Sequence, residues 1–368
     1  MPIADELQRR WYAPDLAPLW WTRPLARVYG LAGALRRGAY RHGMLRAVRL
    51  PVPVVVVGNL VAGGAGKTPL TIALVEALQA RGLRPGVVSR GYGGSATVAQ
   101  LLDGTPDPAL VGDEPTLIHA RTGVPVAVGA RRVRAARLLL EADVDVVLAD
   151  DGLQHYALAR DLEICVVDGV RRFGNGRLLP AGPLREPIAR LRCVDFVVCN
   201  GGTPARGEVP MQLAAVGAVA LADPARSCAL AAFAGQRVNA VAGIGNPARF
   251  FESLRAAGIQ PVERPFPDHH RYRAGDLDFR DGLPVLMTGK DAVKCRGFAK
   301  PDWWGVPVSA VLPSVFLDEV ANRIAEIHSP PSGRLCPNGA GDGPSPRSDP
   351  RSSDAYPHAC PSPEGRGA

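Results

Sequence analysis

Residues 63–68 combine the residue types that bind a phosphate chain. The apolar run 52–57 before them indicates a buried strand, and a helical pattern starts at Thr68. Glycines let the backbone turn tightly and aim its N–H groups at an anion, and the helix N-terminus adds positive charge there. In such a loop Lys67 reaches the β- and γ-phosphates of a nucleotide, and the Thr68 hydroxyl binds Mg²⁺. The predicted nucleotide-binding residues are Gly63, Gly64, Ala65, Gly66, Lys67 and Thr68.

This loop departs from the strict Walker A pattern, since Val61 stands where that pattern has its first glycine. The alternative is a glycine-rich turn in a protein that binds no nucleotide. The order of strand, glycine turn, Lys-Thr and helix favours a nucleoside triphosphate. The rarity of lysine also favours it: the chain uses Lys at four positions, which suggests a specific use for the compact ammonium of Lys67.

Two adjacent carboxylates, Asp150 and Asp151, follow the apolar run 144–149. Open α/β sheets bind ligands at the carboxyl ends of their strands, and hard oxygen ligands suit Mg²⁺. An Asp-Asp-Gly sequence taken alone is more often a turn. Together with the glycine loop, it predicts that Asp150 and Asp151 bind magnesium, directly or through water.

Three loops carry candidates for the acceptor side of a phosphoryl transfer. Asp113 precedes a predicted helix. It is either a base that accepts the proton of the acceptor hydroxyl or simply the N-cap of this helix. His269 lies in the polar segment 266–272, which is otherwise a solvated loop and lacks the spacing of a zinc site. Arg185 and Glu186 lie in a basic loop. Such a loop can bind phosphate oxygens, and the alternative is an exposed surface loop. We predict that both residues bind the substrate. The sequence alone does not show that residues 113 and 269 meet.

The elements that must position these residues alternate between strand and helix. This alternation predicts an α/β protein with a parallel sheet that is covered on both faces. A stretch rich in Gly and Pro at 200–210 marks a boundary, and the alternation resumes beyond it, ending in a helix at about 316–327. The predicted organisation is a helical leader at 1–50, a P-loop NTPase-like core at 51–205, a smaller C-terminal α/β lobe at 206–328, and a disordered tail rich in Pro, Ser and Gly at 329–368.

The formal net charge of +8 is concentrated in residues 1–50, which hold nine Arg, three acidic residues and three of the five Trp. Such a segment favours an anionic partner. Arg beside aromatic rings suits a membrane interface, although the same rings could pack on the main domain instead. No nucleic-acid reader motif accompanies the charge, so we expect no nucleic-acid partner. The sequence shows neither a membrane-spanning apolar run nor a signal peptide, which favours the cytosol.

Seven motifs occur in an order that resembles the tetraacyldisaccharide 4′-kinase family, the lipid A 4′-kinases of Gram-negative bacteria. They lie at 57–69, 89–94, 112–115, 150–155, 178–186, 243–247 and 266–272. The resemblance covers residues 1 to about 328. Ala65 stands where the family usually has Thr, which is a departure within the first motif.

The resemblance implies a kinase that moves the γ-phosphate of ATP to the 4′-hydroxyl of an acylated glucosamine disaccharide 1-phosphate. It places the base on Asp113, its histidine partner on His269, the catalytic lysine on Lys67 and the Walker B acids on Asp150 and Asp151. It further implies that the smaller lobe closes over the nucleotide and that an N-terminal helix touches the inner membrane. The expected location is the cytoplasmic face of that membrane, peripherally bound and with no obligate protein partner.

Two other functions stay open at this stage. One is a different P-loop transferase, or an ATP-dependent ligase, that acts on a soluble acid. The other is a nucleotide-switch protein such as a GTPase. The segment 288–291 lacks the Asn of the guanine-specific Asn-Lys-x-Asp motif, which argues against guanine.

Overall fold

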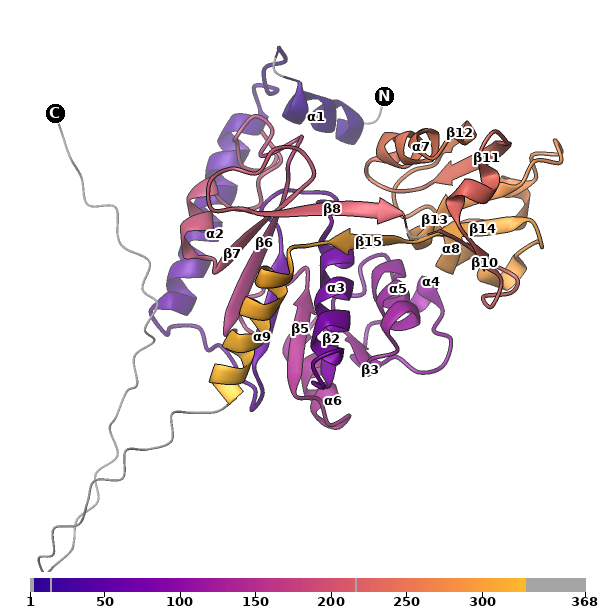
Figure 1. The fold of residues 1–368 in the computed structure, drawn as a ribbon. Helices are drawn as coiled ribbons and strands as arrows, with labels where there is room; N and C mark the ends of the chain where they lie inside the picture. Colours follow the sequence, from indigo (N-terminus) through magenta and orange to yellow (C-terminus); the bar gives the residue numbers. More distant parts are fainter. Residues whose placement is uncertain (1–2, 14, 216, 329–368) are drawn as a thin grey trace, which may run out of the picture.

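The computed structural model describes residues 3–13, 15–215 and 217–328. They form two α/β lobes, with the helices of the N-terminal leader packed on the larger one (Figure 1). The predicted α/β class with a parallel core sheet is therefore confirmed. The prediction for residues 329–368 lies outside the described residues.

The larger lobe is built on a nine-stranded sheet. Its spatial order is β15 (Val308–Val311), β8 (Val209–Ala215), β7 (Phe196–Asn200), β6 (Leu162–Asp168), β1 (Val54–Gly58), β5 (Val146–Asp150), β2 (Pro85–Ser89), β4 (Val126–Val128) and β3 (Gln100–Leu101). The pairs from β8 through β4 are parallel, and the strands at the two edges, β15 and β3, are antiparallel to their neighbours. Parallel strands end at the same edge, so the segments after β1 and β5 lie close together.

Helices cover both faces of this sheet, which explains why β1 is buried at every position. Val55 and Val57 pack on one face with α3 (Lys67–Gln79), α5 (Asp113–Thr122) and α9 (Ser314–His328). Val54 and Val56 pack on the other face with α6 (Arg132–Leu140) and the loop after β5. A short helix, α4 (Pro108–Val111), precedes α5.

The smaller lobe is built on a six-stranded sheet. Its spatial order is β10 (Ser227–Cys228), β9 (Ala218–Ala220), β14 (Trp303–Val306), β13 (Val285–Thr288), β11 (Arg237–Ala242) and β12 (Gln260–Pro265). The helices of this lobe are α7 (Pro247–Ala256) and α8 (Gly289–Cys295), with 3-10 turns at Leu230–Phe233, Ala274–Leu277 and Arg296–Phe298. A further 3-10 helix, η1 (Ile188–Cys193), belongs to the larger lobe.

The predicted boundary at 206–328 needs correction at both of its ends. Strand β8 extends the sheet of the larger lobe and leads into the smaller one, and β15 leads back beside it, with Ala215 paired to Val308. Figure 1 shows these two strands side by side between the lobes. Helix α9 then packs on the large sheet through Phe316, Val320 and Ile324. The sequence places α9 in the second lobe because its apolar periodicity does not say which sheet it covers.

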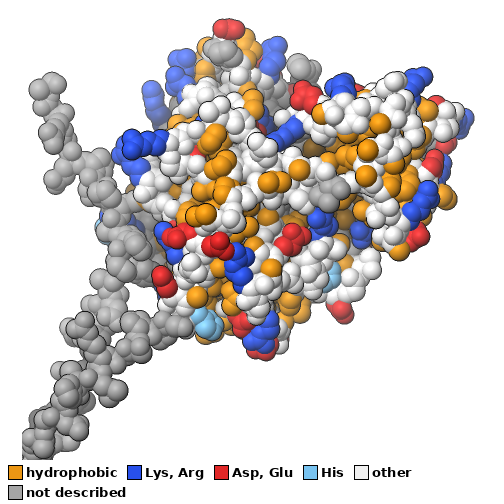
Figure 2. All heavy atoms as spheres, in the orientation of Figure 1, with side chains coloured by type: hydrophobic (Ala, Val, Ile, Leu, Met, Phe, Trp, Pro, Cys, Tyr) orange, Lys and Arg blue, Asp and Glu red, His pale blue; other side chains and the backbone are white. Residues whose placement is uncertain are grey.

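The leader forms two helices, α1 (Ile3–Tyr12) and α2 (Thr22–Arg41), as the sequence predicts. Trp11 Nε1 donates to the Pro180 carbonyl at 3.0 Å, which ties α1 to the core. The outer side of α2 carries exposed apolar side chains together with exposed Arg23, Arg27 and Arg36. Figure 2 shows basic side chains beside apolar ones along this edge of the molecule.

Candidate active site

The glycine loop lies between β1 and α3, at the carboxyl end of the large sheet. Gly66 has φ +96°, and a Cβ at this position would clash with the Asn200 side chain. Two side-chain amides fix the loop: Asn59 Nδ2 donates to the Gly63 carbonyl at 3.1 Å, and Asn200 Nδ2 donates to the Ala65 carbonyl at 2.9 Å. With these carbonyls bound, the N–H groups of the turn and of the α3 N-terminus are available to an anion.

Lys67 is the first residue of α3, and its Nζ lies 3.6 Å from Asp151 Oδ1. Arg185 Nη1 donates to both oxygens of that carboxylate, at 3.0 and 3.1 Å. Burial alone would raise the pKa of Asp151, but the two cations outweigh burial and hold this pKa below its usual value. Asp151 is therefore an ionised carboxylate that joins the glycine loop to the loop of Arg185.

Asp150 ends β5 and is fully buried. Thr71 Oγ1 donates to its Oδ1 at 3.1 Å, whereas no described residue forms a hydrogen bond with its Oδ2. Burial raises the pKa of Asp150, because no direct ion pair offsets the loss of water. Mg²⁺ prefers oxygen donors, and the unpartnered Asp150 Oδ2, the carboxylate of Asp151 and the hydroxyl of Thr68 are donors of this kind. The chemistry of the predicted metal ligands is therefore compatible with the ion. Within the described residues no group of three or more His, Cys, Asp or Glu side chains could hold a metal, so other ligands would be needed to complete the shell.

Asp113 and His269 meet although they are 156 residues apart: His269 Nδ1 lies 3.1 Å from Asp113 Oδ1. Asp113 is the first residue of α5, and the N-cap position is Gly112, with φ +94°. The capping interpretation therefore does not account for Asp113. The edge of the Tyr92 ring packs on the imidazole, with ring centres 4.9 Å apart. Asp113 comes from the larger lobe and His269 from the smaller one, so the pair exists only because the lobes are in contact.

The charges around this pair favour an ionised Asp113. Burial opposes ionisation, but the hydrogen bond from His269 and the ammonium groups nearby hold the pKa of Asp113 below its usual value. The same hydrogen bond raises the pKa of His269. Lys290 Nζ lies 3.7 Å from Asp113 Oδ2 and 3.3 Å from Glu114 Oε1. The sequence did not predict a role for Lys290, although the rarity of lysine that points to Lys67 applies to it equally.

A cleft of about 520 Å³ separates the two lobes. The glycine loop forms one wall, and Gly245, Arg249 and Lys290 of the smaller lobe face it. Apolar residues of α3, β8 and β15 line a further side. His269 lies in this lining as well, whereas Asp113, to which it is hydrogen-bonded, lines a separate smaller cavity.

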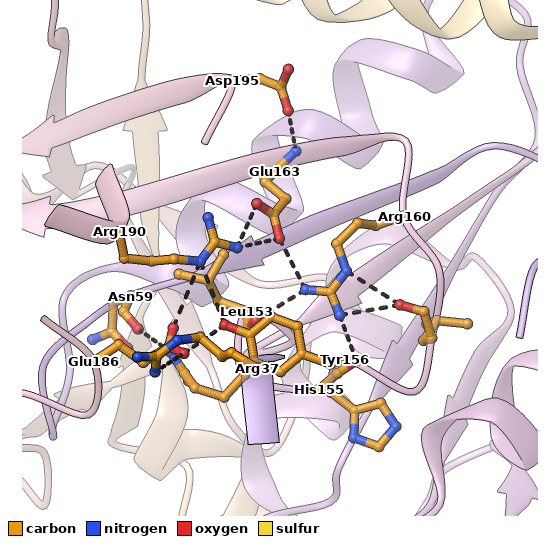
Figure 3. Close-up of polar contacts among 12 residues, drawn as sticks. Arg37, Asn59, Leu153, His155, Tyr156, Arg160, Glu163, Glu186, Arg190 and Asp195 are labelled. Atoms are coloured by element: carbon orange, nitrogen blue, oxygen red, sulfur yellow. Dashed lines mark hydrogen bonds and ion pairs between the residues drawn. The ribbon is translucent and has the colours of Figure 1, made fainter. Parts of the chain in front are cut away.

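Arg185 and Glu186 differ in their surroundings. Glu186 is only 3% exposed, and it accepts from Tyr156 Oη at 2.5 Å and from Arg37 Nη1 of α2 at 3.1 Å. Figure 3 shows Glu186 beside Arg37 and Tyr156, and its contacts join α2, the segment after the two aspartates, and η1. Arg185 instead faces Asp151 at the edge of the cleft.

Comparison with protein families matches residues 18–325 to LpxK, described as tetraacyldisaccharide-1-P 4′-kinase. The chain belongs to this family. The resemblance that the seven motifs carry is thereby confirmed, and the 4′-kinase membership decides against the ligase and nucleotide-switch alternatives.

Curated tetraacyldisaccharide 4′-kinases are similar to this chain over nearly their whole length. The protein of Xanthomonas euvesicatoria pv. vesicatoria is 53% identical over 332 residues, which cover 87% of this chain and 96% of that protein. The protein of Aeromonas hydrophila subsp. hydrophila is 51% identical over 322 residues, which cover 86% and 96%. The chain is therefore a kinase of the same kind.

The fold of this 4′-kinase matches a solved structure of the family. The LpxK of Aquifex aeolicus, crystallised in complex with ATP, superposes with a TM-score of 0.70 at 28% identity, over 83% of this chain and 98% of that chain.

None of the helices within residues 3–13, 15–215 and 217–328 has both the length and the apolar character that a membrane span requires.

Proposed function

We propose that this 4′-kinase transfers the γ-phosphate of ATP to the 4′-hydroxyl of an acylated glucosamine disaccharide 1-phosphate, with Asp113 as the base. One observation carries the choice of base: a buried carboxylate is hydrogen-bonded to His269, and His269 lines the cleft that contains the glycine loop. The related enzyme of Aquifex aeolicus was crystallised with ATP, which supports the same donor here.

The donor half of the site is the glycine loop with the N-terminus of α3. Backbone N–H groups of residues 63–68 bind the phosphate oxygens, and Lys67 places an ammonium beside the β- and γ-phosphates. A Mg²⁺ ion held by Thr68 and Asp150, with Asp151 as a direct or water-bridged ligand, would neutralise charge on the same two phosphates.

The acceptor half centres on Asp113. As the 4′-oxygen bonds to the γ-phosphorus, its proton passes to Asp113, and ADP leaves with the electron pair of the broken P–O bond. His269 occupies Oδ1 of the base, whereas no described residue forms a hydrogen bond with Oδ2, which is therefore suited to take the proton. The transition state of such a transfer is loose, so most of the catalysis comes from positioning and from neutralised charge.

Arg185 and Glu186 serve the acceptor in different ways. Arg185 lines the cleft beside Asp151, and we assign it to an anionic group of the bound molecules. Glu186 is buried, and its oxygens are already bound by Tyr156 and Arg37. We therefore assign Glu186 to the support of the acceptor site rather than to a direct contact.

Helix α2 suits contact with the surface in which a lipid substrate lies. Leu25, Val28, Leu31 and Leu35 recur at helical spacing and are 49–65% exposed. Exposed Arg side chains on the same helix match anionic headgroups. This arrangement supports a peripheral position on the cytoplasmic face of the inner membrane, with the acylated disaccharide reached from the bilayer.

The test is transfer of radiolabelled γ-phosphate to an acylated disaccharide 1-phosphate in detergent micelles. We expect product with the wild type, and a loss of kcat of about 10²-fold or more in Asp113→Asn. Asp103→Asn, which changes an exposed acid that lines neither cavity, is the matched control. Near-normal kcat in Asp113→Asn would refute the base, and lack of transfer by the wild type would refute the substrate.

A further inference from the structure

A second, smaller cavity of about 130 Å³ lies against Asp113. Its lining includes Asp113, His269 and Lys294 of α8. The sequence suggests no role for Lys294. Lys294 does not border the large cleft that holds the glycine loop. We therefore infer its function from the groups that it contacts.

Lys294 is a buried lysine, with a side chain only 9% exposed. Its Nζ lies 2.8 Å from Asp291 Oδ1 and 3.8 Å from Asp113 Oδ2, and it sits 5.1 Å from the centre of the Tyr272 ring. No described residue forms a well-directed hydrogen bond with this ammonium. Burying an ammonium is costly unless carboxylates lie close to it, so the position of Lys294 is a specific feature of the fold.

The two oxygens of Asp113 have different environments. Oδ1 accepts from His269 and from the N–H of Glu114. Oδ2 has no hydrogen-bond partner among the described residues but faces two ammonium groups, Lys290 at 3.7 Å and Lys294 at 3.8 Å. Two nearby positive charges favour the ionised form of a carboxylate. Because no hydrogen-bond donor occupies Oδ2, this oxygen can accept a proton.

The two lysines are not equivalent. Lys290 is half-buried and also lies 3.3 Å from Glu114 and 3.6 Å from Asp268, whereas Lys294 is more deeply buried. Lys294 has Asp291 as its other close carboxylate.

The cavity is lined by other polar groups besides Lys294. Lys294 is the more deeply buried of the two lysines that lie near the base. Asp107 and Arg271 line the cavity from opposite lobes, and Tyr272 is held neutral because burial raises its pKa. The ring of Tyr92 packs against the ring of His269.

We propose that Lys294 is a positioning residue for the base: its buried ammonium keeps Asp113 ionised and its Oδ2 free for the proton of the acceptor hydroxyl. This inference rests on the proposed role of Asp113. Every cation within 4 Å of Asp113 in the described part of the chain, His269, Lys290 and Lys294, belongs to the smaller lobe. The cations that offset the burial of the base are therefore all supplied by that lobe.

The lowered pKa of Asp113 agrees with this role, since burial acts in the opposite direction. Removing a cation at this distance raises the pKa of a carboxyl by about 1–3. The acid limb of the kcat/KM profile reports the ionisation of the free base. In Lys294→Met this limb should therefore move to higher pH by about one unit or more, and activity below the new pKa should fall about tenfold per pH unit.

The experiment compares pH profiles of kcat/KM for the full-length wild type, Lys294→Met, Lys294→Arg and Lys300→Met, at saturating ATP in micelles. Lys294→Arg keeps the charge and should restore most of the wild-type profile. Lys300→Met removes an exposed lysine of the same lobe that pairs with Asp278, and it should leave the profile unchanged. If Lys294→Met does not fold, Lys294→Gln, which keeps a polar end without charge, gives the same comparison.

A Lys294→Met profile that superposes on the wild type overturns the inference. So does an equal loss of activity at every pH that Lys294→Arg fails to rescue, because that pattern marks a purely structural role. The Asp113→Asn variant separates the two claims. If it is inactive and the Lys294→Met profile does not move, the proposed function stands and only the role of Lys294 fails; if it is active, the base assignment itself fails.

Discussion

Removing Arg190 should destabilise this kinase by about 3 kcal/mol. Its Nη2 lies 2.6 Å from both oxygens of Glu163, and the two side chains are 11% and 10% exposed (Figure 3). In Arg190→Met the apolar stem remains, but Glu163 keeps only Arg160, at 2.9 Å, as a charged partner. Breaking a buried ion pair from one side costs about 3–5 kcal/mol, and the remaining Arg160 places the expected value at the lower end.

Urea unfolding followed by tryptophan fluorescence measures this free energy. The matched control is Arg192→Met, an exposed arginine of the same helix η1, which should change stability by about 0.5 kcal/mol or less. Adding Glu163→Gln to Arg190→Met removes the unpaired charge and should recover part of the loss. The reasoning fails if Arg190→Met lies within about 1 kcal/mol of the wild type, or if the double variant is less stable than the single one.

Two further predictions concern the nucleotide and the membrane. Asn200→Ala removes the amide that donates to the Ala65 carbonyl in the glycine loop. The affinity for ATP, measured by calorimetry, should therefore weaken about tenfold. An unchanged Kd would show that the loop keeps its shape without this hydrogen bond. Replacing the exposed α2 residues Val28, Leu31 and Leu35 by Glu should sharply reduce sedimentation with anionic vesicles while micellar kinase activity on a short-chain acceptor persists. Unaltered sedimentation would remove α2 from the membrane contact.

Local patterns predict the elements that carry the proposed donor half of the site. The strand before Gly63, the helix that begins at Lys67, and Asp150 at a strand end all depend on neighbours in sequence, and the structure places them together. The sequence missed Thr71, which holds Asp150, because a threonine inside a helix has no signal that distinguishes it.

The acceptor half depends on long-range contacts, and the sequence could only name its parts. Asp113 and His269 were candidates, but their meeting requires two lobes to pack, which no local pattern encodes. Glu186 was predicted to bind the substrate, with an exposed surface loop as the alternative, because its neighbours are Pro, Gly and Arg. Its burial beside Arg37 of a distant helix was not predicted. The boundary of the smaller lobe was misplaced because short edge strands such as β15 carry little periodicity.

The pairing of Ala215 with Val308 makes the smaller lobe a continuous insertion in the chain. Its entry and exit points are ladder partners, so a two-residue turn joining them would convert β8 and β15 into an ordinary hairpin with unchanged register. The remaining chain would retain the complete nine-stranded sheet, the glycine loop and Asp113, while every cation that surrounds the base would leave with the insert. Exchanging the smaller lobe between homologues would therefore change the charges around the base. The large sheet and its glycine loop would stay the same.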